Sequence, residues 1–235
     1  MKTRTELMVM LTCNDVTVPN AYELFDSAKD LPVFDWGFKS ANISDDEVVR
    51  LIKYMKENGK TTFYEVIERN KPAYQRGERL AGLAGFDYGM GMKYDADLHA
   101  TLKSLGIKFC PTLGKPGCVY NGQHGVLMGT PDEIVDEGKY LLSEKGVDGI
   151  TIPVFRYYQD SHALLARILK EFPDTPIFIA GSVDSFEKID MMFDLGIAKF
   201  TMGSALINRK YNPDGDFRAN LEIVANYIEQ KYPRG

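Results

Sequence analysis

The stretch that decides the fold runs from residue 177 to residue 208 and reads IFIAGSVDSFEKIDMMFDLGIAKFTMGSALIN. A short apolar run ends at Gly181-Ser182, an amphipathic segment follows, and a second apolar run ends at Gly203-Ser204. Two Gly-Ser pairs therefore lie one strand–helix unit apart, each at the C-terminal end of an expected strand. The pattern predicts two consecutive units of a parallel α/β fold.

The same alternation of apolar runs and amphipathic segments continues through the whole chain. We expect a helix after each of the strands 7–12, 31–39, 61–67, 86–92, 107–113, 149–155, 176–180 and 198–202. Capping boxes at Ser44 and Thr130 mark two helix starts. Eight strand–helix units predict a single-domain (β/α)8 TIM barrel spanning residues 1–235. The alternative, a doubly wound open sheet, explains the alternation but not the count of eight.

Bulk composition narrows the class of protein. The 235 residues are 44% hydrophobic and 26% charged, with a formal net charge of −5, which argues against nucleic acid or an anionic membrane as partner. We find no leader pattern and no apolar run long enough to span a membrane. Three cysteines without a C-x-x-C pattern fit a reducing compartment, so we expect a cytoplasmic protein. We expect no metal centre and no cofactor; barrels of this size often form homo-oligomers, but nothing fixes the oligomeric state.

The two Gly-Ser pairs are also the best candidates for a ligand site. Glycine lets backbone amides approach a ligand closely, and serine adds a hydroxyl donor, so together they form a nest for an anion such as phosphate. In TIM barrels the phosphate site is commonly built by the loops after strands seven and eight. We therefore assign Gly181, Ser182, Gly203 and Ser204 to phosphate binding. The alternative is that they form only tight strand-to-helix turns.

The segment Val33–Lys39 reads VFDWGFK, in which aromatic residues alternate with Asp35, Gly37 and Lys39. Barrel strands pack their outward side chains on helices, so the aromatic residues should face out and Asp35 and Lys39 should face the interior, toward the mouth. A charge inside a packed barrel is costly unless it is paired or used. The two residues could exchange a proton with a substrate or hold an anion. They could also form a purely structural ion pair.

Other charged residues stand at the ends of further strands. One of Glu65 and Glu68 should point inward, and the alternation does not say which. Asp15 could bind a ligand or cap the next helix, since aspartate is a preferred cap. Arg156 could clamp a carboxylate bidentately or be a surface arginine. We name Glu65 as a catalytic candidate, and Arg156 with Thr151, on the preceding strand, as substrate contacts.

The loop from Gly114 to Gly129 is longer than a usual strand-to-helix connection, and long loops in compact domains tend to be lids or binding loops. It carries Lys115, which could be a Schiff-base amine or a phosphate contact. His124 could be an acid–base group that also contacts the substrate. The alternative for both residues is a solvated loop.

Two parts of the sequence resemble known families. The tail IAGSVDSFEKIDMMFDLGIAKFTMGSALINR is similar to the closing segment of the ribulose-phosphate-binding barrels, whose N-acetylmannosamine 6-phosphate 2-epimerases also end in Gly-Ser-Ala after strand eight. FDWGFKS resembles the strand-two motif of the 2-keto-3-deoxy-6-phosphogluconate aldolases. In that family an acidic residue and a basic residue four positions later serve catalysis and substrate binding, and Asp35 and Lys39 occupy those places. The match at Gly125-Val126, TPDEI and Pro153 points to the same family.

The resemblance implies a barrel enzyme that acts on a small phosphorylated sugar or keto acid, with proton abstraction next to a carbonyl as in aldolases. This sequence departs from the aldolases in strand 149–153, GITIP, which lacks their Schiff-base lysine. An imine would need Lys115 or Lys39, or the reaction proceeds without one. Three alternatives stay open: a phosphosugar epimerase or isomerase, metal-assisted enolisation with Asp35, Glu65 and His124 as ligands, and a non-catalytic barrel that binds a phosphorylated ligand.

Overall fold

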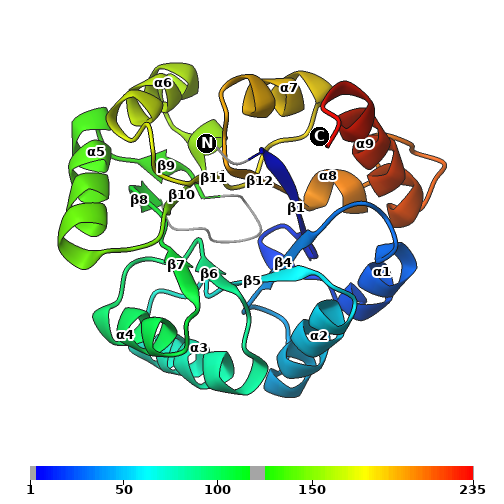
Figure 1. The fold of residues 1–235 in the computed structure, drawn as a ribbon, viewed down its shortest axis with the longest axis horizontal. Helices are drawn as coiled ribbons and strands as arrows, with labels where there is room; N and C mark the ends of the chain where they lie inside the picture. The colour runs from blue at the N-terminus through cyan, green and yellow to red at the C-terminus, as the bar shows by residue number, and fades with distance from the viewer. Residues whose placement is uncertain (1–3, 117–124, 235) are drawn as a thin grey trace.

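Eight parallel strands surround one axis, and helices form a ring outside them (Figure 1). The computed structural model describes residues 4–116 and 125–234. The barrel strands are β1 (Glu6–Met10), β4 (Asp35–Lys39), β5 (Thr61–Glu65), β6 (Tyr88–Met90), β7 (Lys108–Cys110), β10 (Ile150–Ile152), β11 (Ile177–Ile179) and β12 (Lys199–Met202). Their order in the sheet is β10-β11-β12-β1-β4-β5-β6-β7.

The circle closes between β7 and β10, through residues that lie just beyond β7. Thr112 and Thr151 form a parallel bridge. The N–H of Thr151 donates to the Pro111 carbonyl at 2.8 Å, and the N–H of Leu113 donates to the Thr151 carbonyl at 2.9 Å. The predicted (β/α)8 barrel is therefore confirmed, and the open-sheet alternative is wrong.

Helices follow the barrel strands in turn and pack on their outer side (Figure 1). They are α1 (Ala21–Ala28), α2 (Asp45–Glu57), α3 (Lys71–Ala84), α4 (Ala96–Ser104), α5 (Pro131–Tyr140) with the π-helical turn η1 (Leu141–Lys145), η2 (Val154–Arg156), α6 (Ser161–Glu171), α7 (Phe186–Asp194), α8 (Ser204–Ile207) and α9 (Phe217–Lys231). Both predicted capping boxes are present: Glu47 N–H donates to Ser44 Oγ at 3.3 Å, and Glu133 N–H donates to Thr130 Oγ1 at 3.2 Å. No helix in the described part of the chain is long and apolar enough to cross a membrane.

Two antiparallel hairpins interrupt the alternation, and the sequence analysis did not predict them. The first pairs β2 (Thr12–Cys13) with β3 (Val16–Thr17) directly after β1. The second pairs β8 (Lys115–Pro116) with β9 (Leu127–Met128), on either side of residues 117–124. The second barrel strand also begins later than the predicted residue 31. Residues 31–34 form a turn in which Val33 N–H donates to the Leu31 carbonyl, and the strand begins only at Asp35.

The apolar residues form two separate cores. The larger core lies between the strands and the helices, where Trp36 and Phe38 are fully buried and Trp36 contacts Phe25 edge-on. The aromatic side chains of β4 therefore point outward, as predicted. The smaller core fills the barrel interior with Met8, Met10, Phe63, Met90, Cys110 and Phe178. These bulky side chains fill the middle of the barrel, and Met10 among them also lines the open space at the C-terminal ends of the strands.

Candidate active site

A cavity of about 1180 Å³ opens where the strands end. Its lining comes from the C-terminal ends of the strands and the loops that follow, the face on which TIM barrels carry their active sites. Cationic side chains outnumber acidic ones among the described lining residues, although the whole chain carries a formal charge of −5. The cations are Lys39, Arg69, Lys93, Arg156 and Lys210, and the acids are Asp15, Glu65, Glu68 and Asp184.

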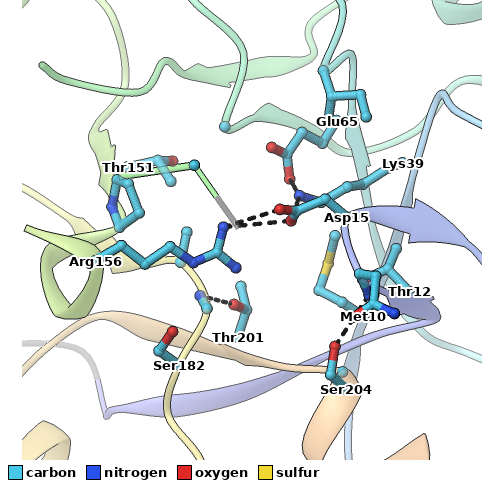
Figure 2. A pocket seen from close by; sticks show the side chains of 18 of the residues that line it. Met10, Thr12, Asp15, Lys39, Glu65, Thr151, Arg156, Ser182, Thr201 and Ser204 are labelled. Atoms are coloured by element: carbon cyan, nitrogen blue, oxygen red, sulfur yellow. Dashed lines mark hydrogen bonds and ion pairs between the residues drawn. The ribbon is translucent and has the colours of Figure 1, made fainter. Parts of the chain in front are cut away.

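Four of these side chains form one connected group, which we call the charged cluster: Asp15, Lys39, Glu65 and Arg156. Lys39 Nζ lies 2.7 Å from Asp15 Oδ1 and 3.5 Å from Glu65 Oε2. Arg156 Nη1 lies 3.1 Å from Asp15 Oδ2. Figure 2 shows the Arg156 guanidinium reaching across the cavity toward Asp15. Each of the four side chains is less than a fifth exposed, so their charges act on one another and on a ligand with little solvent screening.

Asp15 reaches the cluster because the β2–β3 hairpin folds over the barrel mouth. Its turn residues Asn14 and Asp15 have φ of 51° and 64°, the left-handed pair of a type I′ turn, which is common in two-residue hairpins. The N-cap of α1 is Asn20, so Asp15 does not cap that helix. Of the two interpretations of Asp15 left open by the sequence, the structure contradicts the helix cap. The Asn-Asp dipeptide between two β-rich pairs was the signal that could have located this hairpin.

Glu65, rather than Glu68, is the glutamate of β5 that joins the cluster. Glu68 lies beyond the strand and hydrogen-bonds Ser40. Burial raises the pKa of the Glu65 carboxyl, and Lys39 only partly opposes this rise. Gly91, with φ of 70°, makes room for the carboxyl group, because a Cβ at this position would lie 2.5 Å from Glu65 Cδ. A buried carboxyl with a raised pKa next to a lysine is typical of a group that gives and takes protons.

The prediction that Asp35 reaches the mouth is wrong. Asp35 faces the interior, but it is the first residue of β4, and Lys39 is the last. Four steps of about 3.3 Å along the strand separate the two by about 13 Å. Asp35 is 4% exposed and forms an ion pair with Lys199, the first residue of β12, at the opposite end of the barrel. Burial raises the pKa of Asp35 against the attraction of Lys199.

The loop after β11 brings Arg156 and the backbone of Gly181 into direct contact. A Cβ on Gly181 would lie 2.5 Å from Arg156 Nη2, and Gly181 has a φ of 76°, so a side chain here would displace the guanidinium and strain the backbone. The N–H of Gly181 donates to Thr201 Oγ1 at 2.6 Å. The amide of Gly181 is therefore occupied by the protein, contrary to its predicted role as a phosphate donor. The missing side chain at Gly181 leaves room for the Arg156 guanidinium.

The next amides along this loop are better placed to bind an anion. Ser182 has φ of 60°, an unusual value for a residue other than glycine, and such outliers gather at ligand sites. In the described part of the chain, the N–H groups of Ser182 and Val183 have no backbone acceptor. Ser204 begins the short helix α8, where the first N–H groups have no partner within the helix. Figure 2 shows Ser182 and Ser204 on the same side of the cavity, below Thr201.

Two lysine side chains lie next to Ser182 and Asp184 in the loop that carries the anion nest, the name we give to the amides at Ser182, Val183 and Ser204. Lys188 Nζ donates to the Ser182 carbonyl at 2.6 Å and lies 2.8 Å from Asp184 Oδ1. Lys210 Nζ lies 2.6 Å from the other Asp184 oxygen. Two ammonium groups thus share one carboxylate beside the nest. Asp184, Lys188 and Lys210 were not predicted as site residues, because their roles depend on the fold rather than on a local motif.

The remaining predicted site residues are more weakly connected. Thr151 lines the cavity, but its hydroxyl donates to the Cys110 carbonyl at 2.8 Å. Lys115 begins β8, where its backbone pairs with Met128. His124 lies outside the described residues. No group of three or more histidine, cysteine, aspartate or glutamate side chains within residues 4–116 and 125–234 is arranged to hold a metal ion. Asp35 and Glu65, two of the three ligands in the metal-assisted alternative, lie at opposite ends of their strands.

Comparisons with known proteins find the same fold. No protein-family model and no curated protein sequence matches this chain. A solved structure described as native KDPGal is 13% identical with a TM-score of 0.63, over 99% of this chain and 95% of that one. Orotidine 5'-phosphate decarboxylase from Pyrococcus horikoshii OT3 is 18% identical with a TM-score of 0.65, over 95% and 99%. A 4-hydroxy-2-oxoglutarate aldolase is 13% identical with a TM-score of 0.58, over 95% and 93%. At these identities the likeness shows the shared barrel fold.

Proposed function

We propose that this protein is an enzyme that removes a proton next to the carbonyl group of a small phosphorylated sugar or keto acid, in the manner of a lyase of the aldolase type. The phosphate would bind at the anion nest, and the carbonyl would lie against the charged cluster. The observation that carries the proposal is that one cavity holds both parts, the nest at Ser182 and Ser204 and the cluster around Lys39. The aldolases among the similar barrels are consistent with it.

Within the cluster, Glu65 is the group we assign to proton transfer. Burial raises the pKa of its carboxyl toward neutral pH, and a general acid or base works best when its pKa lies near the working pH. As the proton leaves the carbon, the bonding electrons move to the carbonyl oxygen and form an enolate. Lys39 and Arg156 supply the positive charge that stabilises this enolate. The enolate can then attack an aldehyde, which is the condensation direction of an aldolase.

Two ion pairs hold the Nζ of Lys39 in place. Carboxylate oxygens of Asp15 and Glu65 lie 2.7 Å and 3.5 Å from it. An imine would require this nitrogen to leave both partners and attack a carbonyl carbon. We therefore propose enolisation without an imine at Lys39. This explains how the chain could work without the lysine that the aldolases carry on strand six.

A second candidate, a phosphosugar isomerase or epimerase, draws support from the pair of carboxylates. Asp15 and Glu65 both contact Lys39, so two proton carriers flank one cation. Epimerisation removes a proton and returns one to the other face, and isomerisation returns it to the neighbouring carbon. Either reaction can use two such groups. The first step, and the enolate or enediolate it forms, is shared with the aldolase.

Proton exchange in D₂O tests the shared step directly. Phosphorylated 2-keto acids and ketose phosphates, each paired with its unphosphorylated analogue, would be incubated with the protein and followed by ¹H NMR. We expect deuterium to replace the proton next to the carbonyl of at least one phosphorylated compound, far faster than in its analogue, and Glu65→Gln to abolish this. Exchange that survives in Glu65→Gln would contradict the assignment. Binding without exchange in any compound would favour the non-catalytic alternative, and a lysine trapped by borohydride would favour an imine.

A further inference from the structure

Thr17, on the strand β3 of the first hairpin, contacts the main chain of Lys39 twice. Its side chain is buried, with 1% of the residue exposed. The hydroxyl accepts a hydrogen bond from the Lys39 N–H at 3.0 Å and donates to the Lys39 carbonyl at 2.6 Å. One hydroxyl thus satisfies both backbone groups of the residue whose ammonium lies at the centre of the charged cluster.

The sheet itself leaves these two backbone groups of Lys39 without a partner. The ladder between β1 and β4 ends at the pair Met10–Gly37, and its last bond runs from the Leu11 N–H to the Gly37 carbonyl at 2.8 Å. Beyond that point the chain turns away from β4 into the hairpin. On the other edge of β4, strand β5 continues as far as Glu65. Thr17 therefore takes the place of the missing strand on one edge only, next to the site.

Further bonds fasten the same hairpin to the end of β4. The N–H of Thr17 donates to the Ala41 carbonyl at 3.1 Å, and Asn42 Nδ2 donates to the Thr17 carbonyl at 2.9 Å. Asp15 stands two residues earlier on this hairpin and forms the 2.7 Å ion pair with Lys39. Thr17 therefore holds both partners of that ion pair: Lys39 through its backbone and Asp15 through the hairpin.

We propose that Thr17 is a positioning residue for the charged cluster, whose hydroxyl fixes the Lys39 ammonium between the carboxylates of Asp15 and Glu65. The proposal rests on the proposed function for its catalytic consequence, but its geometric claim stands apart from any substrate. A lysine has a long flexible side chain, so the direction of its Cα–Cβ bond decides where its ammonium is placed. If the end of β4 loses both bonds, Lys39 gains freedom and its average distance from Glu65 grows.

The substitution Thr17→Val removes the hydroxyl and keeps the shape of the side chain. Thr17→Ser is the conservative variant, since it retains the hydroxyl. Thr62→Val is a matched control at the other end of the barrel. Thr62 is fully buried, and its hydroxyl donates to Asp87 Oδ2 at 2.7 Å and accepts from the Asp87 N–H at 3.1 Å. Both valine variants lose a buried hydroxyl with two hydrogen bonds, so they should lose similar stability.

The decisive readout is the pKa of Glu65, measured by ¹³C NMR on glutamate-labelled protein, with Asp15 and Arg156 left unchanged. In Thr17→Val we expect this pKa to rise by about one unit, because the ammonium that opposes the rise moves away. Proton exchange on a substrate should fall about tenfold, mainly in kcat. Thr17→Ser should restore both, and Thr62→Val should change neither.

An unchanged pKa of Glu65 in folded Thr17→Val would overturn the proposal, as would an equal shift in Thr62→Val. If the valine variant does not fold, Thr17→Cys, whose thiol is a weaker hydrogen-bonding group, provides the same comparison. If the wild-type protein exchanges no proton on any compound, the proposed function fails while the pKa comparison still decides the role of Thr17.

Discussion

Removing the positive charge of Lys39 should raise the pKa of Glu65. Lys39→Met keeps most of the side chain and deletes the ammonium, which lies 3.5 Å from Glu65 Oε2. Two unit charges at that distance attract by about 5 kcal/mol at an effective dielectric constant of about 20. At about 1.4 kcal/mol per pKa unit this sets an upper limit of roughly three to four units. Because water entering the space offsets part of the loss, we expect a rise of about one unit or more.

The rise can be followed by titrating ¹³C-labelled glutamate carboxyls by NMR, with Glu65→Gln used to identify the resonance. Lys93→Met is the matched control. Lys93 lines the same cavity, but its ammonium pairs with Glu137 and donates to the Gly114 carbonyl at 2.8 Å. The Lys93 variant should leave Glu65 unchanged. A Glu65 carboxyl that titrates identically in Lys39→Met and in wild type would refute the electrostatic reasoning on which the charged cluster rests.

Three further predictions follow from the same contacts. Asp35→Asn should destabilise the fold by about 3 kcal/mol in urea denaturation, because it leaves the partly buried Lys199 unpaired, while the titration of Glu65 stays as in wild type; a shifted titration of Glu65 would show that Asp35 acts on the site. Gly91→Ala should cost about 1–3 kcal/mol, since its φ is 70° and its Cβ would meet the Glu65 carboxyl, and full stability at this position would contradict the packing. The raised pKa of Glu65 means that the folded state holds this proton more tightly than the unfolded chain, so its stabilising contribution is complete below about pH 4 and is lost as pH rises through the folded pKa. Glu65→Gln should therefore gain stability relative to wild type between about pH 5 and 8, measured as Tm at each pH, and a constant difference would contradict the burial effect.

The barrel could be predicted from sequence because its signals are local. The Gly-Ser ends of strands seven and eight, the capping boxes at Ser44 and Thr130, and the period-two pattern of β4 each follow from residues next to one another. Closure could be inferred only from the count of eight units. The bridge between Thr112 and Thr151 that completes the ring joins residues far apart in the chain.

The site was harder to predict, because a residue must lie at the C-terminal end of its strand, as well as on the inner face, to reach the cavity. Alternation placed Asp35 and Lys39 correctly on the inner face but could not tell the top of the strand from its bottom. It also could not choose between Glu65 and Glu68, since the end of β5 was uncertain by a residue or two. Asp15 joins the cluster through a hairpin whose turn signal is present in the sequence but was not recognised, so its role stayed open between a ligand contact and a helix cap.

The central claim is that the anion nest and the charged cluster form one site. A titration of the ¹⁵N- and ¹³C-labelled protein with inorganic phosphate tests it most directly. We predict that the amide resonances of Ser182 and Ser204 and the carboxyl resonance of Glu65 shift together and saturate with one Kd. The account would be contradicted if phosphate shifted only the resonances of surface lysines. It would also be contradicted if the resonances of the two serine amides and of the Glu65 carboxyl saturated with different Kd values.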